Sequence, residues 1–183
     1  MVNLALLVLR LTTGGLMMGH GAQKLFGWFG GSELKGTSGW MESMELKPGR
    51  PWAWMASLSE FGGGALTTLG LLDPAGPLAL IASMTMATAK VHWGKPIWVT
   101  TGGAELPLTN TALATALILT GPGAYSLDSL LGTRLPRWVA IPGLAAIAAG
   151  IALGNRPDLT QRLASPQQTP ETAEPERQVA ASA

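Results

Sequence analysis

Hydrophobic residues fall into five long runs, separated by short polar or Gly- and Pro-rich stretches. The runs cover about residues 3–29, 52–72, 77–93, 105–120 and 138–154. A helix that crosses the hydrocarbon core of a membrane needs roughly 17 to 25 mostly apolar residues. The pattern therefore predicts five membrane-spanning helices. The last run is interrupted by Pro142 and is barely long enough to span.

Two further segments have a different character. Residues 37–46 place Trp40, Met41 and Met44 at helical spacing, which predicts a short amphipathic helix at the membrane interface, where Trp is enriched. Residues 155–183 are rich in Pro, Gln, Glu, Thr and Ser and poor in large apolar side chains. Such a composition predicts a disordered tail.

The amino-acid composition argues against several classes of protein. The chain has 183 residues, of which 47% are hydrophobic and only 13% charged, whereas an average soluble domain carries about 25% charged residues. With a net charge of +1 and no basic run, nothing indicates nucleic-acid binding. Cysteine is absent, which excludes disulfides, thiolate metal sites and iron–sulfur clusters. Electron chemistry would therefore need a bound cofactor or a partner protein.

Several polar side chains lie inside the apolar runs. A charge at the centre of a bilayer costs roughly 2.5 to 3.5 kcal/mol on insertion scales, so these groups should face the interior of a bundle. In the first run, Arg10, Met17, Gly21 and Lys24 lie within about 60° of one another on a helix, which predicts one inward face. Glu60 lies in the second run, beside three glycines that allow close helix contacts.

Alternate threading of the helices brings most of these polar groups to the same half of the membrane. We call this half side B, the side on which the first run ends, and the opposite half side A. The residues that map to side B are His20, Gln23, Lys24, Glu60, Lys90, His92, Glu105 and Asn110, and only Arg10 maps to side A. Six of the seven tryptophans also map to side B. The sequence thus predicts a polar pocket near side B, walled by aromatic residues.

The candidate cofactor-binding residues of this pocket are six, and no catalytic residue can be named. They are His20, Gln23, Lys24, Glu60, His92 and Asn110. A structural alternative stays open, in which Lys24 or His20 neutralises Glu60, Lys90 extends to the surface, and Glu105 is an ordinary acid at a helix N-terminus. Two histidines are a weak signal for haem, which we do not expect, and we predict no metal site.

The distribution of Lys and Arg between the loops predicts how the protein is oriented in the membrane. Side B loops and the near tail hold six Lys or Arg residues, against Arg134 and Arg137 on side A. An excess of Lys and Arg marks the cytoplasmic face. We therefore predict an N-terminus outside and a cytoplasmic C-terminal tail.

The segment LRLTTGGLMMGHGAQKLFGWFGG, residues 9–31, resembles the signature of the DoxX family of bacterial membrane proteins. Further matching motifs lie at residues 36–46, at Glu60-Phe61-Gly62-Gly63 and at residues 119–130, so the resemblance covers roughly residues 3–131. It implies an all-α, four-helix membrane bundle in a bacterial inner membrane. The expected organisation is a DoxX-like core over residues 1–131, an additional transmembrane helix over 132–154 and a flexible tail over 155–183.

The resemblance also implies a function. The family is distantly similar to the small membrane subunit of thiosulfate:quinone oxidoreductase, which suggests a membrane subunit of a redox system that binds quinone. Carried over by motif, His20, Gln23, Lys24 and Glu60 would serve this role. The alternative is a non-catalytic accessory subunit, docked to a larger energy-converting membrane complex through the additional helix and tail. Transport of a small solute is a weaker hypothesis, since the sequence has no internal repeat or broken-helix pair.

Overall fold

The computed structural model describes residues 1–156 and 158–159 of the chain. Every regular element among these residues is helical, which confirms the predicted all-α class. The α-helices are α1 (Val2–Phe26), α2 (Glu33–Ser43), α3 (Gly49–Leu69), α4 (Ala75–Ala87), α5 (Glu105–Thr120), α6 (Leu127–Leu131) and α7 (Ala140–Gly154). Single turns of other helix types cover Trp28–Gly30, Thr88–His92, Val99–Thr101 and Arg137–Val139.

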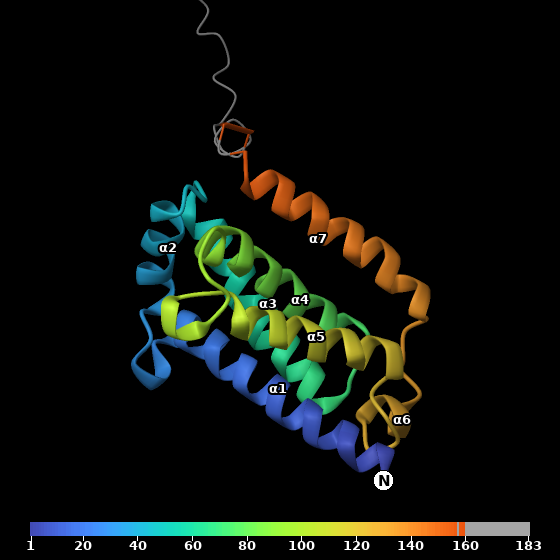
Figure 1. The fold of residues 1–183 in the computed structure, drawn as a ribbon. Coiled ribbons are helices and arrows are strands. Elements are labelled where there is room, and N and C mark those ends of the chain that lie inside the picture. Colours follow the sequence, from blue (N-terminus) through green and yellow to red (C-terminus); the bar gives the residue numbers. More distant parts are fainter. Residues whose placement is uncertain (157, 160–183) are drawn as a thin grey trace, which may run out of the picture.

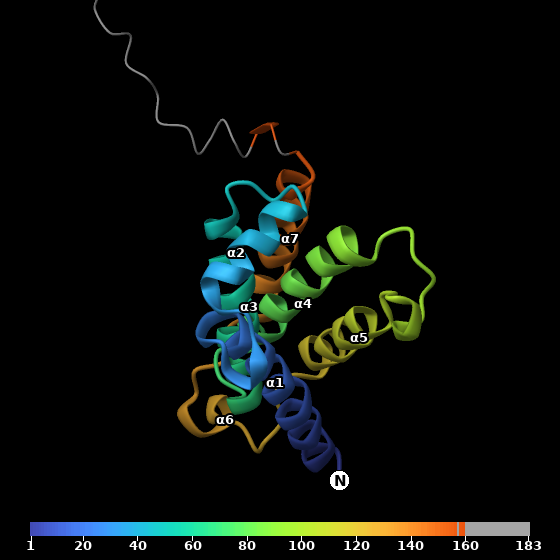
Figure 2. The same ribbon diagram turned by 90° about the vertical axis from the view of Figure 1, so that its left-hand side faces the viewer.

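The helices pack as an elongated bundle (Figure 1). α3 contacts both α1 and α4, α4 contacts α5, and α7 packs on α4. α2 lies at one end of the bundle and α6 at the opposite end, close to the N-terminus (Figure 1). Figure 2 shows α5 and α7 on different sides of α4, so the two helices do not cover the same face.

Glycines set the ends of the two long helices. α1 stops at Gly27, which has φ +71°, and α3 stops at Gly70, with φ +63°. These left-handed conformations end a helix readily at glycine, which has no Cβ to clash. Each of the two helices therefore ends three residues before the end predicted from the sequence.

Close backbone contact joins α1 to α3. A Cβ on Gly14 would stand 2.6 Å from the Thr68 amide nitrogen, and one on Gly64 would stand 2.5 Å from the Met18 amide nitrogen. The inward face predicted for the first helix is confirmed, because Arg10, Met17 and Gly21 are buried. Small residues thus hold the two helices together, as is common between membrane helices.

Three local features differ from the sequence prediction. The third helix does not continue as an α-helix to its end: α4 stops at Ala87, and Thr88–His92 forms one π turn. A short helix, α6, occupies part of the segment expected to be a loop, and Ser126 caps it by accepting a hydrogen bond from the Ser129 amide at 3.2 Å. Pro142 does not interrupt α7, because it lies in the first turn, where no backbone donor is needed.

Two of the described helices are long and apolar enough to cross a membrane by themselves. They are Val2–Phe26 and Arg137–Gly154. α5, with 16 residues, is only about 24 Å long at 1.5 Å per residue. The predicted disordered tail, 155–183, lies almost wholly outside the described residues.

Candidate functional site

A pocket of about 480 Å³ lies between α3, α4 and α7. α2 and the segment that follows it close one end, so the pocket is in the half of the bundle that contains α2. The volume falls in the usual range for small-molecule sites, about 300 to 1,000 Å³. The residues that line it include Lys24, Trp40, Met41, Met44, Trp52, Met55, Leu58, Glu60, Ser83, Met86, Lys90, Ala146 and Gly150.

The polar groups of the pocket converge on Glu60. Its side chain is 4% exposed and forms an ion pair with Lys24 of α1. The Ser83 hydroxyl of α4 donates a hydrogen bond of 2.6 Å to the Glu60 Oε1 atom. A buried carboxylate is stable only with such partners. Three helices therefore contribute to one compact polar site in an otherwise apolar pocket.

Apart from Ser59 and Lys90, the rest of the pocket wall is apolar. Met41, Met44 and Met86 line it together with Trp40 and Trp52. Methionine adapts its shape to irregular space, and tryptophan offers a large apolar surface.

Part of the apolar pocket lining is exposed at the outer surface of the bundle. Met55 and Leu58 also line the pocket, and they are 50% and 52% exposed. An apolar ligand could therefore enter from the side of the bundle.

Four of the predicted site residues do not line this pocket. The His20 imidazole is exposed and bonds to the Gln23 side-chain oxygen at 3.1 Å. The His92 Nδ1 atom bonds to the Gly102 carbonyl at 2.7 Å, and the Asn110 amide points to the Met84 sulfur at 3.8 Å. Helical geometry explains His20, because it lies about 100° away from Gly21, which is on the buried face of α1.

Of two other polar residues considered in the sequence, one lines the pocket and the other does not. Lys90 lines the pocket from the π turn after α4. The Glu105 carboxylate lies outside it and accepts a hydrogen bond from the Val99 amide at 2.8 Å. Of the predicted cluster, the structure thus brings Lys24, Glu60 and Lys90 together in one pocket.

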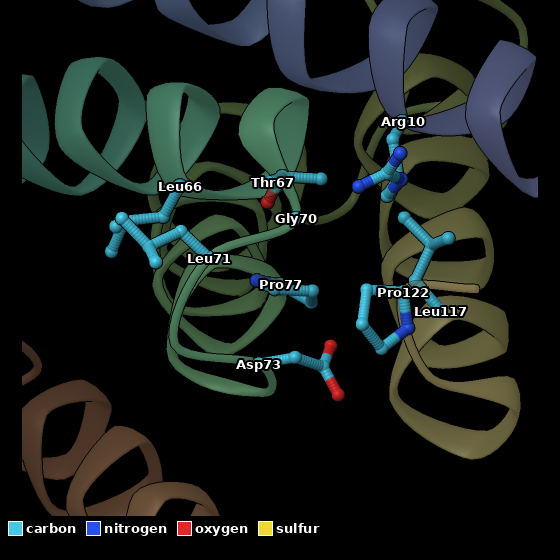
Figure 3. A pocket seen from close by; sticks show the side chains of 9 residues that line it. All are labelled: Arg10, Leu66, Thr67, Gly70, Leu71, Asp73, Pro77, Leu117 and Pro122. Carbon is cyan, nitrogen blue, oxygen red and sulfur yellow. The ribbon is translucent and has the colours of Figure 1, made fainter. Parts of the chain in front are cut away.

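A second polar cluster surrounds Arg10 near the other end of the bundle. The guanidinium is 2% exposed and donates to the Tyr125 carbonyl, but its Nε and Nη1 atoms have no hydrogen-bond partner among the described residues. Figure 3 shows it beside a small cavity with Thr67, opposite Asp73. The cavity volume is about 10 Å³, which is enough for about one water molecule.

Asp73 and Asp128 form the acidic part of this cluster. Asp128 accepts hydrogen bonds of 2.8 Å from the Leu72 and Asp73 amides and from the Thr133 hydroxyl. Burial raises the pKa of the Asp73 carboxyl to about 6, against the opposing effect of nearby arginines. Arg10, which remained an outlier in the sequence, therefore belongs to a separate polar site.

Sequence reasoning missed Ser83 and the contribution of α7 to the pocket. Serine is common in membrane helices, and its position carries no signal by itself. α7 is apolar around most of its surface, so its sequence does not reveal which side faces the bundle. Among the described residues, no group of His, Cys, Asp or Glu side chains could hold a metal ion.

Comparison with known proteins gives one family. Residues 5–93 match the sequence model of the DoxX family. Residues 5–93 therefore form a DoxX domain. The match covers α1 to the π turn after α4, whereas α5, α6 and α7 lie outside it.

The family and the two apolar helices are features of a membrane protein. No curated protein and no solved structure matches the chain. The DoxX match includes Lys24, Glu60, Ser83 and Lys90, so the polar part of the pocket lies in the DoxX domain, and its α7 wall does not.

Proposed function

We propose that this DoxX protein is a multi-pass subunit of a membrane redox system and binds a quinone in the pocket between α3, α4 and α7. The observation that carries the proposal is the Lys24–Glu60–Ser83 group inside an apolar pocket with an apolar opening. Membership of the DoxX family is consistent with a membrane subunit of a redox-related system. The expected location is a bacterial inner membrane.

The residues of the pocket fit a quinone head. A quinone takes up electrons and protons at two carbonyl oxygens, which need hydrogen-bond donors and a nearby proton acceptor. The Lys24 ammonium can donate to such an oxygen, and the Glu60 carboxylate can accept or deliver a proton. Ser83 holds the Glu60 carboxylate in place through its hydrogen bond. Electrons would come from a partner protein, since the chain has no cysteine.

The first prediction tests the polar group. Binding of a short-tailed benzoquinone to the purified protein can be followed through quenching of tryptophan fluorescence, because Trp40 and Trp52 line the pocket. We expect Lys24→Met to weaken binding at least about tenfold, since it removes the charge-assisted hydrogen bond to a quinone oxygen. Glu60→Gln should weaken binding as well, since Lys24 loses the carboxylate that holds its ammonium group in place. Glu105→Gln is the matched control, because this carboxylate lies outside the pocket, and its affinity should equal that of the wild type. Unchanged binding by both pocket variants would disprove the proposal.

A second candidate function is an accessory subunit of a larger membrane complex. It is favoured by exposed apolar side chains in and beside the loop between the π turn and α5, where Trp93 is 82% exposed and Trp98 is 61% exposed. Purification under native conditions separates the two functions. Recovery in a large complex of fixed stoichiometry, without quinone, would support the accessory role.

A further inference from the structure

The face of α7 that packs on the bundle carries three glycines with different surroundings. Gly143, Gly150 and Gly154 are separated by seven and four residues, so they lie on the same side of the helix. A Cβ on Gly143 would stand 2.8 Å from Leu78 Cδ1, and one on Gly154 would stand 2.9 Å from Met86 Cε. At these two points α7 touches side chains of α4.

Gly150 lies between these two contacts and touches nothing. Among the described residues, no atom of another part of the chain lies within 4 Å of the position that its Cβ would take. Gly150 also lines the pocket, together with Ala146 one turn earlier. Ile147, between Gly143 and Gly150, also packs on the buried core of the bundle. The contacts of Gly143, Ile147 and Gly154 therefore hold α7 against the bundle, and Gly150 leaves a void that is continuous with the pocket.

The shape of this void limits what can occupy it. The void lies between the contacts of Ile147 and Gly154, which are seven residues apart, roughly 10 Å along the helix axis. A second helix has a diameter of about 10 Å and could enter only if one of these contacts opened. A single apolar chain fits between them without moving α7. The apolar lining and the exposed Met55 and Leu58 at the opening favour a chain that arrives from lipid.

We propose that the void beside Gly150 receives the apolar tail of a membrane amphiphile, and that Gly150 is the specificity-determining residue for this tail. The identity of the amphiphile as a quinone rests on the proposed function, but the tail site rests on the packing of α7. Because α7 lies outside the matched DoxX domain, the head would be held by the DoxX domain and the tail by this additional helix.

The test uses two benzoquinones with the same head, one without a tail and one with a decyl tail. The wild type should bind the tailed probe at least about tenfold more tightly, because the tail gains packing contacts in the void that the tail-less probe leaves empty. Gly150→Leu fills the void and should abolish this preference, so that the two probes bind with similar affinity. Ala152→Leu is the matched control, since Ala152 is exposed and lies about 200° around α7 from Gly150.

The outcomes separate the two proposals. A preference for the tail that survives in Gly150→Leu, or that is absent in the wild type, overturns the tail site even if the head still binds. If neither quinone binds, the proposed function fails, and the tail site is tested alone with a photoreactive octadecanol in lipid nanodiscs. Labelling at Met86 and α7 in the wild type and in Ala152→Leu, lost in Gly150→Leu, supports it, and absence of labelling in the wild type overturns it.

Discussion

The protonation of Asp73 should make the stability of the protein depend on pH. It lies in the turn between α3 and α4 and is 5% exposed. Burial raises the pKa of its carboxyl from 3.8 to about 6. Arg134, Asp128, Arg137 and Arg10 are the charged groups that act on it, and the three arginines lower the pKa while Asp128 raises it. The folded state therefore favours the neutral acid.

This shift fixes the sign of a pH dependence. A carboxyl with a raised pKa stabilises the fold below the pKa of the unfolded chain, and this stabilisation is lost as the pH rises through about 6. We expect Asp73→Asn, which stays neutral, to gain thermal stability relative to the wild type as the pH is raised from about 4.5 to about 7.5. Thermal unfolding at both pH values measures the difference.

The control for this experiment is Glu45→Gln, because Glu45 is an exposed acid in a surface ion pair with Lys47. Such pairs contribute little to stability, so its difference from the wild type should be small at both pH values. A difference between Asp73→Asn and the wild type that does not change with pH would contradict the assigned pKa.

Site residues were predictable from the sequence where a charged side chain lies within an apolar run. Glu60 and Lys24 are charges within apolar runs, and the structure brings them together. His20 lies on the outer side of α1, where it is exposed, so its imidazole is not buried among apolar side chains. Ser83 gives no signal in the sequence, because its role depends entirely on which helix lies opposite.

At the scale of elements, the α1–α3 contact can be tested with neighbouring glycines. Gly14 has no room for a methyl group beside the Thr68 and Gly64 backbones, whereas a Cβ on Gly15 would meet nothing within 4 Å. We expect Gly14→Ala to destabilise the protein by about 1 to 3 kcal/mol, as overpacking does. Gly15→Ala should be neutral or slightly stabilising, because Ala is the better helix former.

Thermal or denaturant unfolding of the two variants, compared with the wild type, gives the measurement. Equal stability of Gly14→Ala and Gly15→Ala would show that α1 and α3 do not cross as closely as described. Both substitutions add one methyl group to the same helix, so each serves as the control for the other.

The helices themselves were largely predictable, but their ends were not. Apolar runs located α1, α3, α5 and α7, and the residues at which they stop depend on conformations such as that of Gly27. The π turn after α4 carries no sequence pattern that distinguishes it from an α-helical turn. α6 was missed because its five residues are too short to show a hydrophobic period.

At the scale of the whole molecule, the orientation in the membrane stays a prediction, and the sequence makes it easy to test. The chain has no cysteine, so single cysteines can be introduced without background. We expect Lys35→Cys and Lys95→Cys to react with a membrane-impermeant maleimide only after the cells are opened, because side B should be cytoplasmic. Arg134→Cys should react in intact cells. The reverse pattern would invert the topology.

The overall arrangement was predictable only in part. Alternation of the helices correctly indicated that Lys24, Glu60 and Lys90 share one region. It could not indicate that this region opens toward α7, because the contact between α7 and α4 is made by small residues that are common in any apolar helix. The three-dimensional packing therefore determines the shape of the pocket. The sequence pattern predicts only the depth in the membrane at which its polar residues lie.

The position of α7 in the chain has a consequence for biosynthesis. Its residues leave the ribosome after all the other walls of the pocket, since synthesis proceeds from the N-terminus. Until α7 docks through Gly143 and Gly154, the groove between α3 and α4 is open along its length. A lipid-soluble ligand present in the membrane during insertion could therefore be enclosed as the last wall closes, rather than entering the finished protein.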